Sequence, residues 1–296
     1  MKQCLFILQY TGVIICRSCG SVRHDPNMIC YGAEIVMAKQ NIYDNPVFFE
    51  GYKKLREKTS NANDLFEIPA LFSLLPDLKG KAVLDLGCGF GEHCKAFVKK
   101  GAAKVVGIDI SEKMIREAET VNRDPAITYM HLPMEDLDKM DGTFDVVVSS
   151  LAFHYVKDFS GVIRMIYEKT NMGGVLVFSQ ENPLCTSHSD GDRWTRDENG
   201  NKLYLNLYSY GVEGERKTKW FVDGVEKYHR MFSTIINTLI EAGFTVEKMT
   251  EPLPDEKLLK NHPEYCDLFH KPDFLVVRAR KQECIMAKGT VHSEGQ

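Results

Sequence analysis

The stretch VLDLGCGFGEH, residues 83–93, decides the fold of this chain. A short apolar run ends in a carboxylate at Asp85, and three glycines follow at alternate positions. Such a run is typical of a buried strand, and the spacing of FGEHCKAFVKKG (90–101) predicts a helix that stops at Gly101. Because a glycine-rich turn between a strand and a helix lets a ligand approach the backbone closely, this turn is the first candidate binding site.

The same alternation of strand and helix continues outward from this turn. The predicted strands are 81–87, 103–111, 126–132, 143–153, 174–180, 244–249 and 271–281. The predicted helices are 90–101, 112–121 (with Ser111 as N-cap), 159–171 and 230–243. Alternating elements of this length make a doubly wound parallel sheet. Since no long helix separates the last two strands, we expect an α/β, Rossmann-like, seven-stranded sheet with the last strand antiparallel.

The regular pattern also divides the chain. Residues 41–281 are expected to form one domain, in which 41–80 make a helical lid and 183–228, polar, aromatic and glycine-containing, make an insertion on the substrate side. Residues 282–296 are predicted to be a disordered tail.

The first forty residues lie outside the regular pattern. Met37 begins MAKQNIYDNPVFFEGY, which is typical of a natural start, so we expect 1–40 to be an N-terminal extension, of which residues 1–36 precede the native start. The alternative is a zinc site, since four potential ligands follow the spacing C-x2-C-x4-H-x5-C, one residue longer than a zinc knuckle. These residues are Cys16, Cys19, His24 and Cys30. We favour the extension and expect no metal.

The bulk composition excludes several classes of protein. The chain has 296 residues and a net charge of -4, with 44% hydrophobic and 26% charged residues, which is ordinary for a globular protein. No basic stripe predicts nucleic-acid binding, and no apolar run reaches the ~18 residues that span a bilayer. The nine cysteines are scattered and odd in number, which favours reduced thiols and a cytoplasmic location. The oligomeric state stays open.

Two kinds of ligand use a glycine-rich turn of this sort. A dinucleotide prefers the spacing G-x-G-x-x-G, whereas this turn reads G-x-G-x-G and has Glu92 where the last glycine would stand. Asp85 and Glu92 would repel a pyrophosphate in a site of low dielectric, and would suit a cation. S-adenosylmethionine carries an ammonium and a sulfonium and fits this preference. An NAD(P)-dependent oxidoreductase, and a turn that merely lets the helix approach the strand, are the alternatives.

At this point the sequence resembles the class I S-adenosylmethionine-dependent methyltransferases. Asp85-Leu-Gly-Cys-Gly-Phe-Gly is similar to their first motif, (D/E)-x-G-x-G-x-G, and VVGIDIS ends the second strand with an acid. HLPMEDL resembles the family's A-E-D segment, and FDVVVSSLAFHYV resembles the fourth strand of the ubiquinone/menaquinone (type 11) group. The resemblance covers about residues 41–281.

The resemblance implies a set of cofactor contacts. Asp109 would accept hydrogen bonds from the ribose hydroxyls, and the Met134 backbone and Glu135 side chain would bind the adenine edge, with Asp136 as a substitute acid. The implied cofactor-binding residues are Asp85, Gly87, Cys88, Gly89, Gly91, Asp109, Ile110, Met134, Glu135 and Ser150.

The acceptor is expected to be a small molecule. The (N/D)-P-P-(Y/F) segment of enzymes that methylate adenine or glutamine amines is absent, and residues 149–152 read SSLA instead. His154, just past the fourth strand, is a candidate base or orienting group, or else packs under the lid. The other catalytic candidates are Tyr155 and His229. Glu181 keeps its family position, whereas Asn182 stands where histidine is common. A non-catalytic protein that binds the same cofactor is the other class of function.

The lid segment supplies two aromatic candidates. Tyr43 and Tyr52 would gain cation–π attraction of about 0.5–2 kcal/mol if they faced the sulfonium. The alternative, which the sequence favours, is that they simply cover the sheet together with Phe48 and Phe49.

Overall fold

The computed structural model describes residues 41–57, 60–188 and 193–283. The chain divides at Asn41, and the fold below is that of the unit that begins at Ile42. The predicted N-terminal extension, its four candidate zinc ligands and nearly all of the predicted tail lie outside the described residues.

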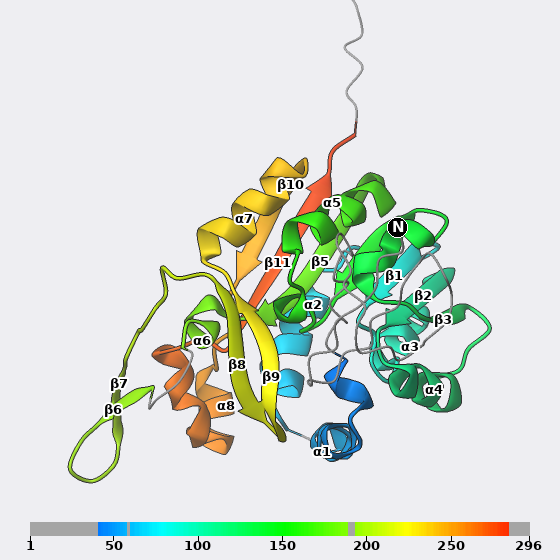
Figure 1. The fold of residues 1–296 in the computed structure, drawn as a ribbon. Coiled ribbons are helices and arrows are strands. Elements are labelled where there is room, and N and C mark those ends of the chain that lie inside the picture. Colours follow the sequence, from blue (N-terminus) through cyan, green and yellow to red (C-terminus); the bar gives the residue numbers. More distant parts are fainter. Residues whose placement is uncertain (1–40, 58–59, 189–192, 284–296) are drawn as a thin grey trace, which may run out of the picture. The chain divides into compact units, whose positions relative to one another are not determined.

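A single seven-stranded sheet forms the centre of this unit (Figure 1). In spatial order its strands are β10 (Phe244–Thr250), β11 (Phe274–Lys281), β5 (Thr170–Glu181), β4 (Phe144–Ser149), β1 (Ala82–Leu86), β2 (Lys104–Asp109) and β3 (Ile127–His131). Neighbouring strands from β5 to β3 are parallel, whereas β11 runs antiparallel to both β5 and β10. The predicted fold class is confirmed, including the antiparallel last strand.

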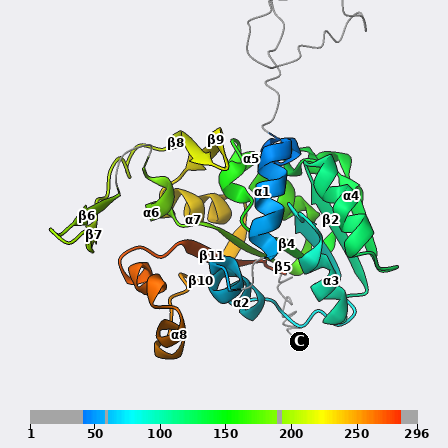
Figure 2. The same ribbon diagram turned by 90° about the horizontal axis from the view of Figure 1, so that it is seen from below.

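Helices cover both faces of the sheet. They are α2 (Ile68–Ser73), α3 (Glu92–Lys99), α4 (Glu112–Val121), α5 (Phe159–Lys169) and α7 (Phe232–Glu241). One buried cluster joins α5 and α7 to the sheet through residues such as Ile163 and Leu239, and a second joins α2 and α3 through Leu71 and Phe97 (Figure 2). The predicted N-cap of α4 is confirmed, since Ser111 Oγ accepts a hydrogen bond from Met114 N at 3.1 Å.

Two predicted boundaries differ from the structure. The strand predicted at 143–153 ends at Ser149, because Leu151 takes a left-handed conformation with φ 53° and the chain then forms the short helix η4 (Phe153–Tyr155). The helix predicted at 159–171 ends at Lys169, because Thr170 pairs with Phe144 and begins β5. An apolar run reveals burial, and it carries no information about a backbone turn within it.

Two segments lie beyond the carboxyl ends of the parallel strands. The first contains η1 (Ile42–Asp44), α1 (Pro46–Glu57) and η2 (Asn63–Glu67). The second follows β5 and contains α6 (Pro183–Thr186), the hairpin of β6 (Trp194–Arg196) and β7 (Lys202–Leu205), and the hairpin of β8 (Gly214–Trp220) and β9 (Val222–His229). Helix α8 (Glu256–Asn261) and η5 (Pro263–Phe269) connect β10 to β11. In the described part of the chain, no helix has the length and apolar character needed to cross a membrane.

Candidate functional site

The glycine turn joins β1 to α3 and is fastened to the next strand. The N–H groups of Gly87 and Cys88 both donate to the carbonyl of Ile108 in β2, at 2.8 and 2.9 Å. Gly87 has φ 71°, and a Cβ atom there would lie 2.7 Å from the Cβ of Ala152. Only glycine therefore lets this turn approach the segment that follows β4, and two adjacent strand ends meet here.

Asp109 ends β2 and is held by the backbone on both sides. Its Oδ2 accepts from Gly89 N at 3.0 Å and its Oδ1 accepts from Ser111 N at 2.8 Å. Burial, before any other cause, raises the pKa of Asp109 to about 6. The carboxylate is ionised at neutral pH and its direction is fixed before a ligand arrives.

Asp85 lies beneath the turn and is almost completely buried. The thiol of Cys94 in α3 donates to its Oδ2 at 3.2 Å. Burial raises the pKa of Asp85 to about 7, with smaller contributions from the charges of Asp109 and Glu67. The structure therefore gathers buried carboxylates at this strand edge, as a cationic ligand requires.

Glu92 does not stand free at the turn. It begins α3, and Arg56 of α1 reaches its Oε2 with an N–O distance of 2.5 Å. The electrostatic preference for a cation therefore rests on Asp85 and on a further buried acid rather than on Glu92. Sequence reasoning missed Arg56, because the pair joins residues 36 positions apart.

That further acid is Glu67, which sequence reasoning missed as well. It comes from η2 and is fully buried, and its Oε1 accepts from the hydroxyls of Ser150, at 2.9 Å, and of Ser179. Its Oε2 has no hydrogen-bond partner among the described residues. Burial raises the pKa of Glu67 above the ordinary value for glutamate. A carboxylate oxygen with no donor, buried beside a ligand site, requires a donor from the ligand.

The remaining predicted cofactor residues lie around this turn. Gly91 is the N-cap of α3, with φ 78°. A Cβ on Gly87 would lie 3.7 Å from Met134 Cε, so η3 (Met134–Lys139) reaches the turn. Ile110 is half-buried, and its carbonyl contacts His131 Nε2 at 2.9 Å. Glu135 is half-buried at the start of η3. Three strand ends thus contribute to one site.

His154 follows β4 and is buried with its ring against Tyr155. The backbone N–H of Glu181 donates to its Nδ1 at 3.4 Å. Burial, the largest cause, lowers the pKa of His154 to about 4. The ring is neutral at pH 7 and, because Nδ1 accepts, its proton is on Nε2.

Aromatic rings of residues 41–80, the predicted lid, pack beside the end of β4. The ring of Tyr43 lies 5.3 Å from that of Tyr52 and 6.0 Å from that of Tyr155, edge to face in both cases. Asp44 fastens this segment to α4, since its Oδ1 accepts from Ser111 Oγ at 2.6 Å. The lid therefore packs directly beside Asp109.

His229 is held within the insertion. Its Nδ1 pairs with Thr186 Oγ1 at 2.8 Å, and its Nε2 pairs with the carbonyl of Tyr210 at 2.9 Å. Both ring nitrogens are thus used to connect β9 with α6 and with the segment before β8. This arrangement is that of a structural histidine.

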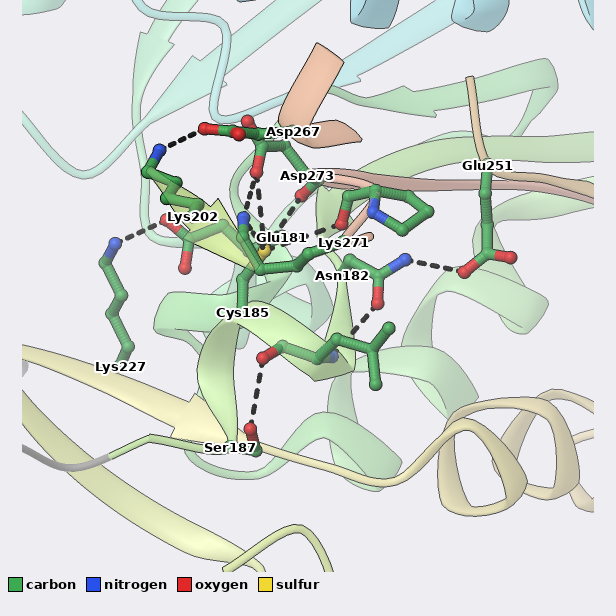
Figure 3. A network of polar contacts seen from close by, with 12 residues as sticks. Glu181, Asn182, Cys185, Ser187, Lys202, Lys227, Glu251, Asp267, Lys271 and Asp273 are labelled. Atoms are coloured by element: carbon green, nitrogen blue, oxygen red, sulfur yellow. Dashed lines mark hydrogen bonds and ion pairs between the residues drawn. The ribbon is translucent and has the colours of Figure 1, made fainter. Parts of the chain in front are cut away.

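A polar cavity of about 330 Å³ lies beyond β5, under the insertion. Glu181 lines it and forms an ion pair with Lys227 at 2.5 Å, and Trp220 forms one wall. Figure 3 shows Lys227 reaching Glu181, and Lys271 beside Asp273 and Cys185. Residues of β5, of the segment that follows it and of the segment before β11 thus surround a space of small-molecule size.

Comparisons with known proteins agree with this geometry. Residues 84–178 match a family described as Methyltransferase domain. An uncharacterized protein of Haemophilus influenzae is 41% identical over 251 residues, which cover 83% of this chain and 98% of the relative. The crystal structure of an S-adenosylmethionine-dependent methyltransferase from Mesorhizobium loti is 38% identical with a TM-score of 0.67, over 75% of this chain and 98% of that chain. The chain belongs to the class I S-adenosylmethionine-dependent methyltransferases.

A shorter match points to one branch of these methyltransferases. The ubiquinone biosynthesis O-methyltransferase of Neisseria meningitidis is 34% identical over 118 residues, or 38% of this chain. The chain spans about half the length of that relative, 50%. This match therefore supports a similar cofactor-binding half of the fold, and it gives no support for a shared acceptor.

S-adenosylmethionine is the cofactor of this methyltransferase, and the residues present fit it. The unpartnered Oε2 of Glu67 and the buried Asp85 suit a cationic group, and Asp109 is held ready to accept hydrogen bonds. The glycine turn leaves room for a ligand against the backbone. The cofactor supplies an activated methyl group.

Proposed function

We propose that this methyltransferase transfers a methyl group to a small-molecule acceptor. The observation that carries the proposal is the polar cavity of about 330 Å³ beside Glu181, in the range of small-molecule sites. His154, which follows β4, links the cavity to the end of that strand, because its Nδ1 accepts from the backbone N–H of Glu181. A cavity of this kind suits a compact acceptor better than a nucleic acid or a protein side chain on a large partner.

The charged residues have complementary roles toward the cofactor in this proposal. Glu67 and Asp85 receive the ammonium group, Asp109 accepts from the ribose hydroxyls, and Met134 with Glu135 binds the adenine edge. Arg56 of α1, which also pairs with Glu92 at the N-terminus of α3, holds the carboxylate of the cofactor. A helix N-terminus and a guanidinium both favour an anion, which supports this last assignment.

The protein accelerates the transfer mainly by positioning and by excluding water. Neutral His154 donates from Nε2 and orients an acceptor oxygen or nitrogen. Burial acts to raise the pKa of Glu181, but its cationic neighbours, the Lys227 ammonium among them, outweigh it and lower that pKa. Glu181 is therefore ionised and can accept the proton that a hydroxyl or amine acceptor loses.

A cytoplasmic location belongs to this proposal. The described cysteines, Cys88, Cys94, Cys185 and Cys266, are all free thiols. Free thiols are typical of reducing compartments, which supports the location.

The direct test is formation of S-adenosylhomocysteine by the full chain incubated with S-adenosylmethionine and a panel of hydroxyl, amine, thiol and carbon acids. We expect acceptor-dependent product. A protein that binds S-adenosylhomocysteine but turns over no acceptor would instead support the non-catalytic alternative, and binding of NAD(H) in its place would contradict the cofactor assignment.

A further inference from the structure

The cavity under the insertion has an excess of positive charge among the described residues that line it, and Lys219 is the one of its cations that pairs with an acid outside the cavity lining, Asp223. Five cationic side chains and two carboxylates are among its described lining residues, although the whole chain has a net charge of -4. Each of these carboxylates already forms an ion pair with a lysine. Glu181 pairs with Lys227, and Asp273 pairs with Lys271 (Figure 3).

Arg216 of β8 is a buried cation without a counter-charge. It is only 7% exposed, and its guanidinium donates to the main-chain carbonyls of Ser187, Glu215 and Val212. Among the residues that the structure describes, no carboxylate pairs with it. A buried charge lacking an opposite charge is unfavourable, so its retention in a cavity wall indicates an anionic ligand.

Arg193 adds a second unpaired guanidinium to the same wall. No hydrogen bond or ion pair joins its side chain to another described residue, and its charge contributes to the lowered pKa of Glu181. Two guanidinium groups beside one cavity match the planar, multi-oxygen shape of a carboxylate or phosphate.

His188 provides an independent observation. Its Nε2 is engaged by the carbonyl of Asn206, whereas its Nδ1 is buried without a partner in the described part of the chain. The ring lines the cavity. Because Nε2 donates to that carbonyl, Nδ1 of the neutral ring accepts a hydrogen bond, for example from an O–H group of a hydrogen phosphate.

We propose that the methyl acceptor carries a carboxylate or phosphate group, held in this cavity by Arg216, Arg193 and His188. This assignment rests on the proposed methyl transfer. Trp220 provides the wall for the rest of the molecule, and Glu181 lies on the path toward His154 and the end of β4. The anionic group thus anchors the acceptor while its nucleophile points toward the strand ends.

The first experiment is calorimetric titration of the full chain with inorganic phosphate and, separately, with succinate, at constant ionic strength set with chloride. We expect saturable binding of at least one of them. Binding of phosphate alone indicates a phosphate ester, and binding of succinate alone indicates a carboxylic acid. Absence of binding of both, under conditions where S-adenosylhomocysteine binds, overturns the proposal.

Substitutions of the two arginines test whether the anion binds in this cavity. Arg216→Gln should weaken anion binding by roughly 30-fold or more, because one partner of a desolvated charge pair is lost. Arg193→Gln, at a half-buried position, should weaken anion binding by roughly tenfold. Arg116→Gln is the matched control, since Arg116 is exposed on α4 and pairs with Glu112. Unchanged anion affinity in both Arg216→Gln and Arg193→Gln would contradict the assignment.

Two further readouts separate this proposal from the proposed function. S-adenosylhomocysteine affinity should be unchanged in Arg193→Gln, which also shows that the variant is folded. Acceptor screening should then favour acids over their methyl esters or amides. Turnover of neutral acceptors in preference to acids would overturn the anionic acceptor and leave methyl transfer intact, whereas absence of any turnover would count against methyl transfer itself.

Discussion

The cofactor end and the acceptor end of this methyltransferase are opposite in charge and in construction. At the cofactor end, carboxylates are buried at the ends of neighbouring strands and in the segment before β1. Burial is the largest cause that raises the pKa of Asp85, Asp109 and Glu67, and the charges of Asp109 and Glu67 raise that of Asp85 further. At the acceptor end, Arg216 and Arg193 are cations without acidic partners in the described residues. We therefore propose that a cationic donor and an anionic acceptor bind at separate walls of one site.

The comparison is tested most strongly at Asp109, which contributes only to the cofactor end. Asp109→Ala should weaken S-adenosylhomocysteine binding by roughly 100-fold or more, because charged hydrogen bonds to two hydroxyls are lost. The N–H groups of Gly89 and Ser111 also lose their acceptor. Calorimetric titration measures the effect, with Asp138→Ala, at an exposed position in η3, as the control.

Anion binding should survive this substitution. Loss of phosphate or succinate binding in Asp109→Ala, alongside normal folding by circular dichroism, would show that the two ends are not independent.

The two ends also differ in how well the sequence predicts them. The glycine turn, Asp109 and the Ser111 cap are local patterns, in which each hydrogen bond joins residues close in sequence or on adjacent strands, and all three were predictable. Glu67 bonds to serines 83 and 112 positions away, so no spacing rule finds it. Arg216 lies in a hairpin whose position over the sheet depends on packing with α1 and η4, which periodicity does not encode.

The second test acts on the acceptor end. Lys227→Met removes the partner of Glu181 and leaves a half-buried carboxylate unpaired, which should raise the pKa of Glu181. We expect kcat/KM for the acceptor to fall by roughly 30-fold, with S-adenosylhomocysteine affinity within about twofold of wild type. Lys217→Met is the matched control, because Lys217 is exposed on the same hairpin, pairs with Glu215 and is not among the described residues that line the cavity. An equal loss of cofactor affinity in Lys227→Met would contradict the separation of the two ends.

The third test is the pH dependence of cofactor binding. Asp109, with a pKa of about 6, and Asp85, with a pKa of about 7, are protonated at pH 5 and ionised at pH 8. Affinity for S-adenosylhomocysteine should therefore increase by about tenfold or more from pH 5 to pH 8. Titrations at several pH values check this, and Asp85→Asn should remove the part of the rise near pH 7.

The stability of the free protein should change in the opposite direction. Both carboxyl groups have a higher pKa in the folded chain than in the unfolded chain, so the folded state binds more protons between about pH 4 and pH 7. Their contribution to stability is therefore largest at low pH and decreases as pH rises through that window. A contribution of the reverse sign, isolated by comparing Asp85→Asn with wild type, would mean that these groups are better solvated than the fold implies.

The smallest expected effect is the most discriminating one, and it concerns Glu67. Glu67→Gln keeps the size of the side chain and an oxygen that accepts from Ser150 and Ser179. It removes the negative charge of a carboxyl group whose pKa is raised by burial. The free protein should become more stable, by about 1 kcal/mol or 2–4 °C in Tm. Cofactor affinity should fall by about fivefold, since an amide N–H then faces the ammonium.

Opposite signs for stability and affinity distinguish a ligand-directed carboxylate from a structural one. If Glu67 served only to tie Ser150 and Ser179 together, the glutamine variant would lose stability, and its cofactor affinity would follow that loss or remain unchanged. Glu119→Gln, at an exposed position on α4, controls for the charge change and should alter neither quantity. Thermal unfolding with and without S-adenosylhomocysteine measures both at once, because the ligand-induced rise in Tm reports affinity for the folded state.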